Sequence, residues 1–164
     1  MKAGIISDTH LSLTNALFQK QVDTCFQDCD LIIHAGDLTD LSILNAFNGK
    51  TIQAVHGNMC NHTSYKKLPS KLLFDLGGFS IGLIHGDALG RWEIENRLWD
   101  VFPEADCMIY GHTHKPVCHK IGNTLIINPG SFRGTGKHGA PGTYAILEVN
   151  ETLSGSLHEV PYLY

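Results

Sequence analysis

Short apolar runs alternate with amphipathic segments through the first third of the chain. Residues 2–7, 30–34 and 51–55 are rich in apolar side chains without an alternation of charge, which is typical of strands buried on both faces. Between them, residues 14–28 place apolar side chains on one helical stripe, and residues 40–48 predict a shorter helix. This order favours parallel strands joined by right-handed crossovers.

After residue 70 the pattern changes to paired strands separated by turn residues. Three hairpins are expected, with strands at 71–76 and 79–85, 117–121 and 124–128, and 143–149 and 154–160. A helix is predicted at 91–102 and a buried strand at 106–110, while the glycine-rich stretch 130–142 is expected to be a loop. Two packed mixed sheets flanked by helices fit this order, which places the chain in the α/β (α+β) fold class.

The composition limits the range of functions. The 164 residues fit a single domain over 1–164, and 43% hydrophobic with 17% charged residues is ordinary for a globular chain. The formal net charge of −4 gives no overall basic field, so nucleic acid is not an expected partner. No stretch approaches the roughly 20 apolar residues of a membrane span. Five cysteines without CxxC spacing, and no recognisable export signal, indicate reduced thiols and a cytoplasmic location.

Potential metal ligands stand where the predicted strands end. The residues are Asp8, His10, Asp37, Asn58, His85, His112 and His114. Open α/β sheets place their sites at the carboxyl ends of strands, so we expect these side chains to converge on one edge. Taken singly, segments such as Asp-x-His or Gly-Asn are usually caps or turns. Their joint occurrence, each time at the end of a strand, makes coincidence the weaker explanation.

The number of ligands indicates two divalent cations. One cation bound by four side chains would leave ligands over, whereas two cations sharing one carboxylate would use all of them. Asp37, near the middle of the series, is the expected shared ligand, with the cations about 3.5–4 Å apart. Imidazole together with carboxylate favours Mn²⁺, with Ni²⁺, Zn²⁺ and iron as alternatives, over Ca²⁺.

The ordered segments resemble a known family. They are Asp8-Thr9-His10, Gly36-Asp37, Gly57-Asn58, His85-Gly86, Gly111-His112-Thr113-His114 and Asn128-Pro129-Gly130-Ser131. Together they resemble the calcineurin-like metallophosphoesterases, and among these the compact YfcE-like phosphodiesterases, over essentially the whole chain. The resemblance implies a four-layer αββα sandwich with a dinuclear site. It also implies a division of ligands, with Asp8, His10, Asp37 and His114 on one metal and Asp37, Asn58, His85 and His112 on the other.

Such a site implies a metal-dependent hydrolase of a small-molecule or nucleotide-like phosphodiester. Two cations would lower the pKa of a bridging water and neutralise the phosphoryl oxygens during in-line attack. Many relatives in the superfamily carry a histidine directly after Gly-Asn, but here Met59 stands there and cannot protonate the leaving alkoxide. Either the chain prefers diesters with good leaving groups, or His62 joins Asp37 and Asn58 as a catalytic residue. The competing interpretation of His62 is an exposed loop histidine.

Two residues are candidates for substrate contact. His56 lies beside Asn58 in the sequence and is expected to line the site. Arg133 follows the Asn-Pro-Gly-Ser turn, and a guanidinium is suited to bidentate phosphate contact.

Other functions stay open on the same fold. The site could serve a phosphomonoesterase or a nuclease, although no basic, aromatic-rich groove supports nuclease work. A retromer subunit of eukaryotes has this fold as a non-catalytic protein-binding scaffold with a compromised metal site, whereas the ligand series here is intact. An exposed patch for a partner or for a homo-oligomer could be formed by Trp92, Trp99, Phe102, Tyr162 and Tyr164. Trp92 and Trp99 are instead expected on a packed helix face, and Tyr162 and Tyr164 over a sheet edge.

Overall fold

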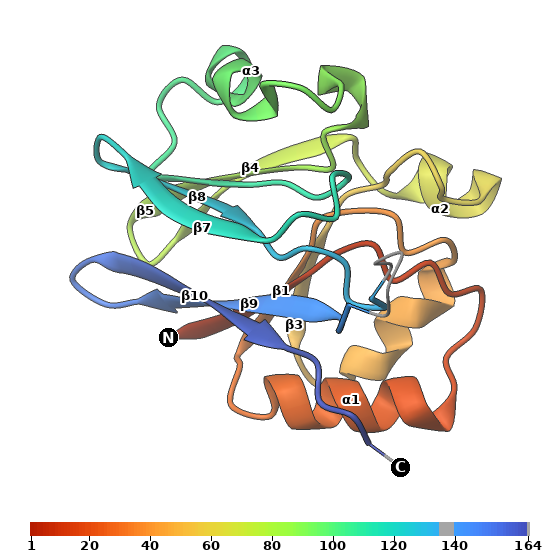
Figure 1. The fold of residues 1–164 in the computed structure, drawn as a ribbon. Coiled ribbons are helices and arrows are strands. Elements are labelled where there is room, and N and C mark those ends of the chain that lie inside the picture. Colours follow the sequence, from red (N-terminus) through yellow and green to blue (C-terminus); the bar gives the residue numbers. More distant parts are fainter. Residues whose placement is uncertain (135–139, 164) are drawn as a thin grey trace.

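Two five-stranded sheets pack face to face, with helices on the outer faces (Figure 1). The computed structural model describes residues 1–134 and 140–163. The first sheet contains, in spatial order, β10 (Leu153–Glu159), β9 (Thr143–Val149), β1 (Lys2–Ile6), β2 (Leu31–His34) and β3 (Thr51–Ala54). The second sheet contains β4 (Lys71–Leu76), β5 (Phe79–Ile84), β6 (Cys107–Ile109), β8 (Thr124–Asn128) and β7 (Val117–Ile121).

Both sheets have a parallel centre and antiparallel edges. Strands β1, β2 and β3 are parallel, and β9 runs antiparallel to β1. In the second sheet β5, β6 and β8 are parallel, while β4 and β7 pair antiparallel to their neighbours. The parallel strands therefore end together at one edge of each sheet, which is where the predicted ligands follow them.

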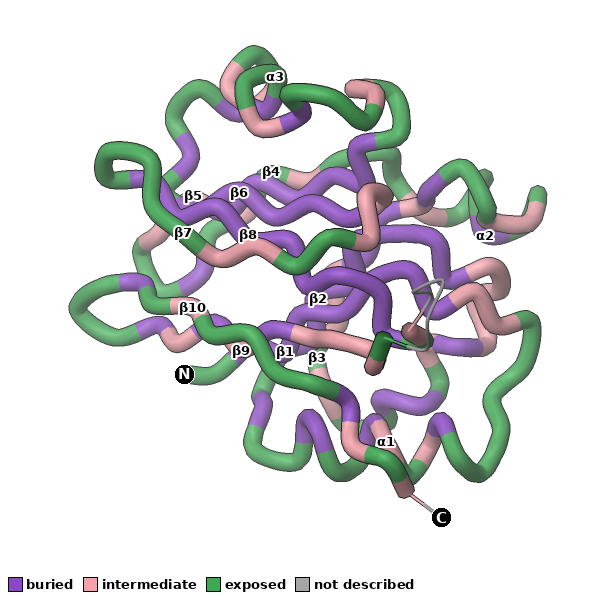
Figure 2. Tube along the Cα trace, viewed as in Figure 1, coloured by how far each residue is buried: buried purple, intermediate pink, exposed green. Residues whose placement is uncertain are grey.

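The alternation of side chains along the central strands explains why these strands are apolar on both faces. Ile5 and Ile33 point between the sheets, where they join residues such as Leu83 and Ile127 in one buried core. Ile6 and Ile32 point outward into a second core. Figure 2 shows these strands as a continuous buried band through the centre of the molecule.

Helices cover both outer faces. On the first sheet lie α1 (Ala16–Phe26), which packs with Phe18, Val22 and Phe26, and the 3-10 helix η1 (Leu41–Phe47). On the second sheet lies α3 (Ile94–Val101), packed with Ile94 and Leu98. The four layers confirm the predicted αββα sandwich. The remaining helices, η2 (Asp87–Leu89) and α2 (His62–Lys67), are short.

The predicted hairpins are confirmed, but the short helices differ from expectation. Residues 40–48 form a 3-10 helix, and α2 was not predicted; it begins because the side chain of Asn61 accepts a hydrogen bond from the N–H of Ser64 at 2.8 Å. The helix expected at 91–102 starts only at Ile94, because Glu93 has a left-handed φ of 52°.

The prediction that Trp92 packs on a helix face is therefore wrong, since its side chain is 81% exposed. Tyr162 is also exposed, at 78%, rather than covering a sheet edge, and Tyr164 lies outside the described residues. None of the five cysteines forms a disulfide in the structure. None of the helices in the described residues combines the length and apolar character that a membrane crossing requires.

Candidate metal centre

The structure brings ligands from both sheets together at the edge where the parallel strands end. Asp8 and His10 follow β1, and His114 follows β6 of the other sheet. The Nε2 atom of His114 lies 3.0 Å from Asp8 Oδ1 and 3.5 Å from His10 Nε2. His10 Nε2 lies 3.7 Å from the same carboxylate oxygen. These three side chains form a first ligand group, in which all ligand atoms lie within 4.8 Å of one another.

A second ligand group lies deeper and contains Asp8, Asp37 and His85. Asp37 follows β2 and His85 follows β5, so this group also joins the two sheets. His85 Nε2 lies 3.2 Å from Asp37 Oδ2. All three residues are almost fully buried, with exposed fractions of 0%, 2% and 0% for Asp8, Asp37 and His85. Carboxylates and imidazoles this far from water need a cation or protons to balance them.

The carboxylate common to the two groups is Asp8, whereas Asp37 belongs only to the second. Asn58 is exposed, and His112 is in neither group, although its ring centroid lies 5.2 Å from that of His85. Asp37 as the bridging ligand, and Asn58 and His112 as ligands of the second metal, therefore stay predictions.

The environment of His85 fits a metal ligand. Its Nδ1 atom lies 2.7 Å from the carbonyl oxygen of Ala35, so this nitrogen carries the proton and donates it. The other nitrogen, Nε2, is then the free ligand atom; it is buried and has no partner with hydrogen-bond geometry. A buried imidazole nitrogen within 4.8 Å of carboxylate oxygens of Asp8 and Asp37 suits a divalent cation held by all three side chains. The residues present thus fit the metal that the sequence predicts.

The protonation of these groups follows from burial and from their mutual charges. Burial lowers the pKa of His85, but the neighbouring Asp37 and Asp8 carboxylates raise it by more. Burial raises the pKa of Asp37, but His85 and the N–H of Met59 lower it by more, so this carboxylate is ionised. Burial lowers the pKa values of His10 and His112, which favours the neutral rings that bind metals.

Ligand residues at this edge adopt a left-handed backbone. Within residues 1–134 and 140–163, five of the seven non-glycine residues with positive φ are predicted ligands: Asp8, His10, Asp37, His112 and His114, with φ between 48° and 63°. Such a conformation costs roughly 1–2 kcal/mol for a residue with a Cβ atom. The strain is held by long-range backbone hydrogen bonds, such as Asp8 N–H to Gly36 O at 3.0 Å and His10 N–H to Asp37 O at 3.1 Å.

Two glycines of the ligand segments are required by close packing. A Cβ atom at Gly36, where φ is 95°, would lie 2.5 Å from Nδ1 of His85. A Cβ atom at Gly57 would collide with the carboxylate of Asp37 and lie 2.6 Å from the ring of His85. The glycines before Asp37 and Asn58 therefore let the second ligand group assemble.

The segment around Asn58 contacts the second ligand group through the backbone of Met59. The N–H of Met59 donates to Asp37 Oδ1 at 2.7 Å, while its side chain is 57% exposed. His62 is the exposed first residue of α2, so it is a helix residue rather than the loop residue of the competing interpretation. The ring of His56 contacts that of Tyr65 in a tilted arrangement, with centroids 3.9 Å apart, and its buried Nδ1 has no hydrogen-bond partner.

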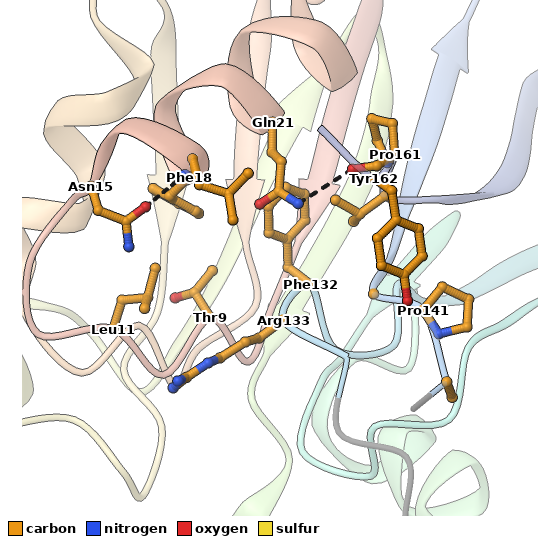
Figure 3. Close-up of a pocket in the computed structure, with 14 residues that line it drawn as sticks. Thr9, Leu11, Asn15, Phe18, Gln21, Phe132, Arg133, Pro141, Pro161 and Tyr162 are labelled. Atoms are coloured by element: carbon orange, nitrogen blue, oxygen red, sulfur yellow. Dashed lines mark hydrogen bonds between the residues drawn. The ribbon is translucent and has the colours of Figure 1, made fainter. Parts of the chain in front are cut away.

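Arg133 is exposed and lies against the segment that carries the first ligands. Its Nη1 donates to the carbonyl oxygen of His10 at 3.1 Å. Figure 3 shows its side chain beside Thr9 and Leu11, along one wall of a pocket of about 370 Å³ between α1 and the C-terminal segment. Arg133 thus connects this pocket to the backbone of a ligand residue, and its role in phosphate contact stays a prediction.

Sequence reasoning missed the polar residues that hold Asp8. The hydroxyl of Ser7 lies 2.6 Å from Asp8 Oδ2 and 2.8 Å from Gly130 O, and can donate its proton to either. The hydroxyl of Ser131 donates to Asp8 O at 3.0 Å. The one available signal was the Asn-Pro-Gly-Ser segment, which sequence reasoning treated only as part of a resemblance.

Comparison with known protein families finds a match over most of the chain. Residues 1–152 match the calcineurin-like phosphoesterase superfamily domain. A probable metallophosphoesterase of Methanothermobacter thermautotrophicus is 36% identical over 133 residues, which covers 80% of this chain and 77% of the relative. A phosphodiesterase of Methanocaldococcus jannaschii is 29% identical over 151 residues, covering 82% of this chain and 86% of the relative.

Solved structures share the fold. An archaeal phosphodiesterase superposes with a TM-score of 0.76 at 23% identity, covering 96% of this chain and 100% of the other. Vps29 of Entamoeba histolytica, in complex with Zn²⁺, gives a TM-score of 0.72 at 21% identity, covering 98% of this chain and 100% of the other. At these identities the likeness concerns the fold alone.

Proposed function

The chain belongs to the calcineurin-like phosphoesterase superfamily, and we propose that it is a metal-dependent phosphodiesterase acting on a small-molecule or nucleotide-like diester. The observation that carries this proposal is the pair of ligand groups sharing Asp8, with the buried Nε2 of His85 3.2 Å from Asp37 Oδ2. Family membership alone would support a phosphoesterase. The pair of groups is what supports a two-metal mechanism.

The residues divide into those that hold cations and those that contact substrate. Asp8, His10, Asp37, His85 and His114 would hold two divalent cations, with Asn58 and His112 completing the set. When bound, two cations lower the pKa of a bridging water and neutralise charge on the phosphoryl oxygens. The mixed imidazole and carboxylate donors suit Mn²⁺, with Ni²⁺, Zn²⁺ and iron as alternatives. The Zn²⁺ complex of Vps29 supports a transition-metal site on this fold.

The proposed preference for diesters rests on Met59, the residue that follows Asn58. Met59 offers a thioether where a proton donor would assist a poor leaving group. A phosphodiesterase among the relatives supports the same preference. Arg133 and His56 are the proposed substrate contacts, and a reducing compartment such as the cytoplasm suits the unpaired cysteines.

One assay tests this function. The purified chain is loaded with Mn²⁺ and given an activated aryl phosphodiester beside the matching monoester, with Asp37→Asn as the control. We expect metal-dependent turnover of the diester, slower turnover of the monoester, and loss of both in Asp37→Asn. Faster monoester turnover would replace the diesterase proposal by a phosphomonoesterase.

A second candidate function is the protein-binding scaffold considered in the sequence analysis. Vps29 of Entamoeba histolytica shares the fold of this chain. The scaffold function would be favoured if the metal-loaded wild type and Asp37→Asn were equally inert on both esters. The buried ligand groups of this chain favour the enzyme instead.

The role of His62 is tested separately. Because it is exposed on α2, we expect His62→Ala to leave turnover of the activated aryl diester nearly unchanged. A loss of a hundredfold or more in kcat, with the metal content intact, would identify His62 as the general acid.

A further inference from the structure

The backbone around His112 has a strained turn that needs outside support. The N–H of Thr113 donates to Gly111 O at 2.7 Å, which closes a three-residue turn with His112 at its centre. The φ of His112 is 63°, so this is the rarer and strained kind of γ-turn. His114 follows with a φ of 57°. The turn bears two predicted ligands, and a relaxed backbone would aim both rings elsewhere.

The side chain of Asn128, at the end of β8, forms hydrogen bonds to both sides of this turn. Its Nδ2 donates to Gly111 O at 2.8 Å and to Thr113 Oγ1 at 3.0 Å, one hydrogen bond on each side of His112. Its Oδ1 accepts the N–H of Gly130 at 2.9 Å. Asn128 is fully buried, and both amide hydrogens and the amide oxygen have partners. A flipped amide would set oxygen against Gly111 O and nitrogen against the N–H of Gly130, so the partners fix one orientation.

The segment that starts at Asn128 also reaches the other ligand strand. The hydroxyl of Ser131 donates to Asp8 O, and Gly130 O lies 2.8 Å from the hydroxyl of Ser7. The N–H of His112 in turn donates to Asp8 Oδ2 at 3.2 Å. The segment therefore joins the ligands that follow β1 to those that follow β6.

We propose that Asn128 is a positioning residue of the metal centre: its amide holds the Gly111–Thr113 turn so that His112 and His114 keep their ligand geometry. This inference rests on the proposed function only in that the centre must bind divalent cations. The amide atoms of Asn128 bond to protein groups, so Asn128 is not proposed as a ligand. Its effect passes through the backbone of the ligand turn, as that of outer hydrogen-bond partners does in metal sites.

The chain offers a matched control on the same strand. Thr124 lies at the opposite end of β8, is buried, and donates from Oγ1 to Ala105 O at 3.0 Å. Thr124→Val removes a buried hydrogen bond to a carbonyl, as Asn128→Ala does, but far along the strand from the ligands. Asn128→Leu is a second variant that keeps the volume of the side chain without its polar atoms.

The experiment compares metal binding with stability. Calorimetry measures Mn²⁺ affinity, the absorption spectrum of the Co²⁺-loaded protein reports the coordination geometry, and the Tm of the metal-free protein reports stability. We expect all three variants to lower Tm. Only the two Asn128 variants should weaken Mn²⁺ binding, by about 10- to 100-fold, and change the Co²⁺ spectrum. At saturating Mn²⁺ their kcat on the diester should fall with little change in KM.

Two results would overturn the inference. If both Asn128 variants bind Mn²⁺ within twofold of wild type, with an unchanged Co²⁺ spectrum and a Tm lowered as in Thr124→Val, the role of Asn128 is only structural. In that case wild-type diester turnover still stands, so the proposed function survives. If wild type itself binds no divalent cation, both the proposed function and this inference fail.

Discussion

At the edge where the parallel strands end, five predicted ligand residues have a left-handed backbone, in addition to glycines such as Gly36. In the hairpin turns of the opposite edge, the left-handed backbone falls on glycine. Gly77, Gly78 and Gly122 form the turns between β4 and β5 and between β7 and β8. A Cβ atom at Gly78 or Gly122 would meet nothing within 4 Å. At the ligand edge His112 and His114 take the same conformation with full side chains.

The difference shows that backbone strain is tolerated where a side chain is needed as a ligand. A hairpin turn needs only the right φ, which glycine supplies without a steric cost. A ligand turn needs both the φ and an imidazole or carboxylate, so strain is accepted and held by hydrogen bonds from distant segments. The two edges should therefore respond in opposite ways to substitution.

The largest contrast is expected between the buried carboxylate of Asp8 and the exposed carboxylate of Asp106. Asp8 belongs to both ligand groups, whereas Asp106 at the opposite edge accepts a hydrogen bond from the N–H of Ser80 at 2.8 Å. Asp8→Asn should abolish binding of two Mn²⁺ ions and reduce diester turnover by about a thousandfold or more, since each metal supplies several kcal/mol of transition-state stabilisation. Asp106→Asn should keep turnover within about twofold. Metal analysis and steady-state kinetics measure both, and equal losses would remove the contrast.

A smaller effect is expected from pH, because the ligand edge buries a histidine at the end of β2. His34 is fully buried, its Nδ1 accepts the N–H of Gly36 at 3.3 Å, and its Nε2 lies 3.4 Å from Thr9 Oγ1. Burial lowers the pKa of His34 to about 4. The unfolded chain, with a histidine pKa of about 6.5, binds a proton over this range that the folded chain does not.

The contribution of His34 to the stability of the metal-free protein should therefore fall by about 3 kcal/mol as the pH drops from 6.5 to 4. Above pH 6.5 this contribution is fully present. Urea unfolding of wild type and of His34→Gln at several pH values isolates it by difference. Parallel pH profiles of the two proteins would mean that His34 titrates alike in the folded and unfolded chains.

The smallest effect tests the cost of a positive φ at a residue with a Cβ atom. Gly122→Ala should lower the free energy of unfolding by about 1 kcal/mol, because a Cβ atom is introduced at a φ of 60°. His112→Gly relieves a positive φ, so the metal-free protein should keep its stability or gain up to about 1 kcal/mol while losing metal affinity. Urea unfolding measures both. A clear loss of stability in His112→Gly would show that its ring, rather than its backbone, dominates.

The layers of the fold could be predicted from the sequence because they depend on local patterns. Apolar runs without alternation, such as 2–7 and 30–34, identify strands buried on both faces, and Gly-Gly and Gly-Asn identify hairpin turns. The 3-10 helix η1 and the short helix α2 could not, because each is only a turn or two long and depends on a single cap. The start of α3 depends on the conformation of Glu93, which no periodicity reveals.

The predicted ligands could be recognised because each follows a strand. Their grouping could not, since the two ligand groups that contain Asp8 depend on distances between segments that are far apart in the sequence. The polar support from Ser7, Asn128 and Ser131 was missed for the same reason. Such residues look like turn formers until the structure shows what their side chains contact.

The most direct test of the central claim is anomalous diffraction from crystals grown with Mn²⁺. The account predicts two peaks about 3.5–4 Å apart, one among Asp8, His10 and His114 and the other among Asp8, Asp37 and His85. A single peak, or peaks only away from this edge, would contradict a two-metal centre.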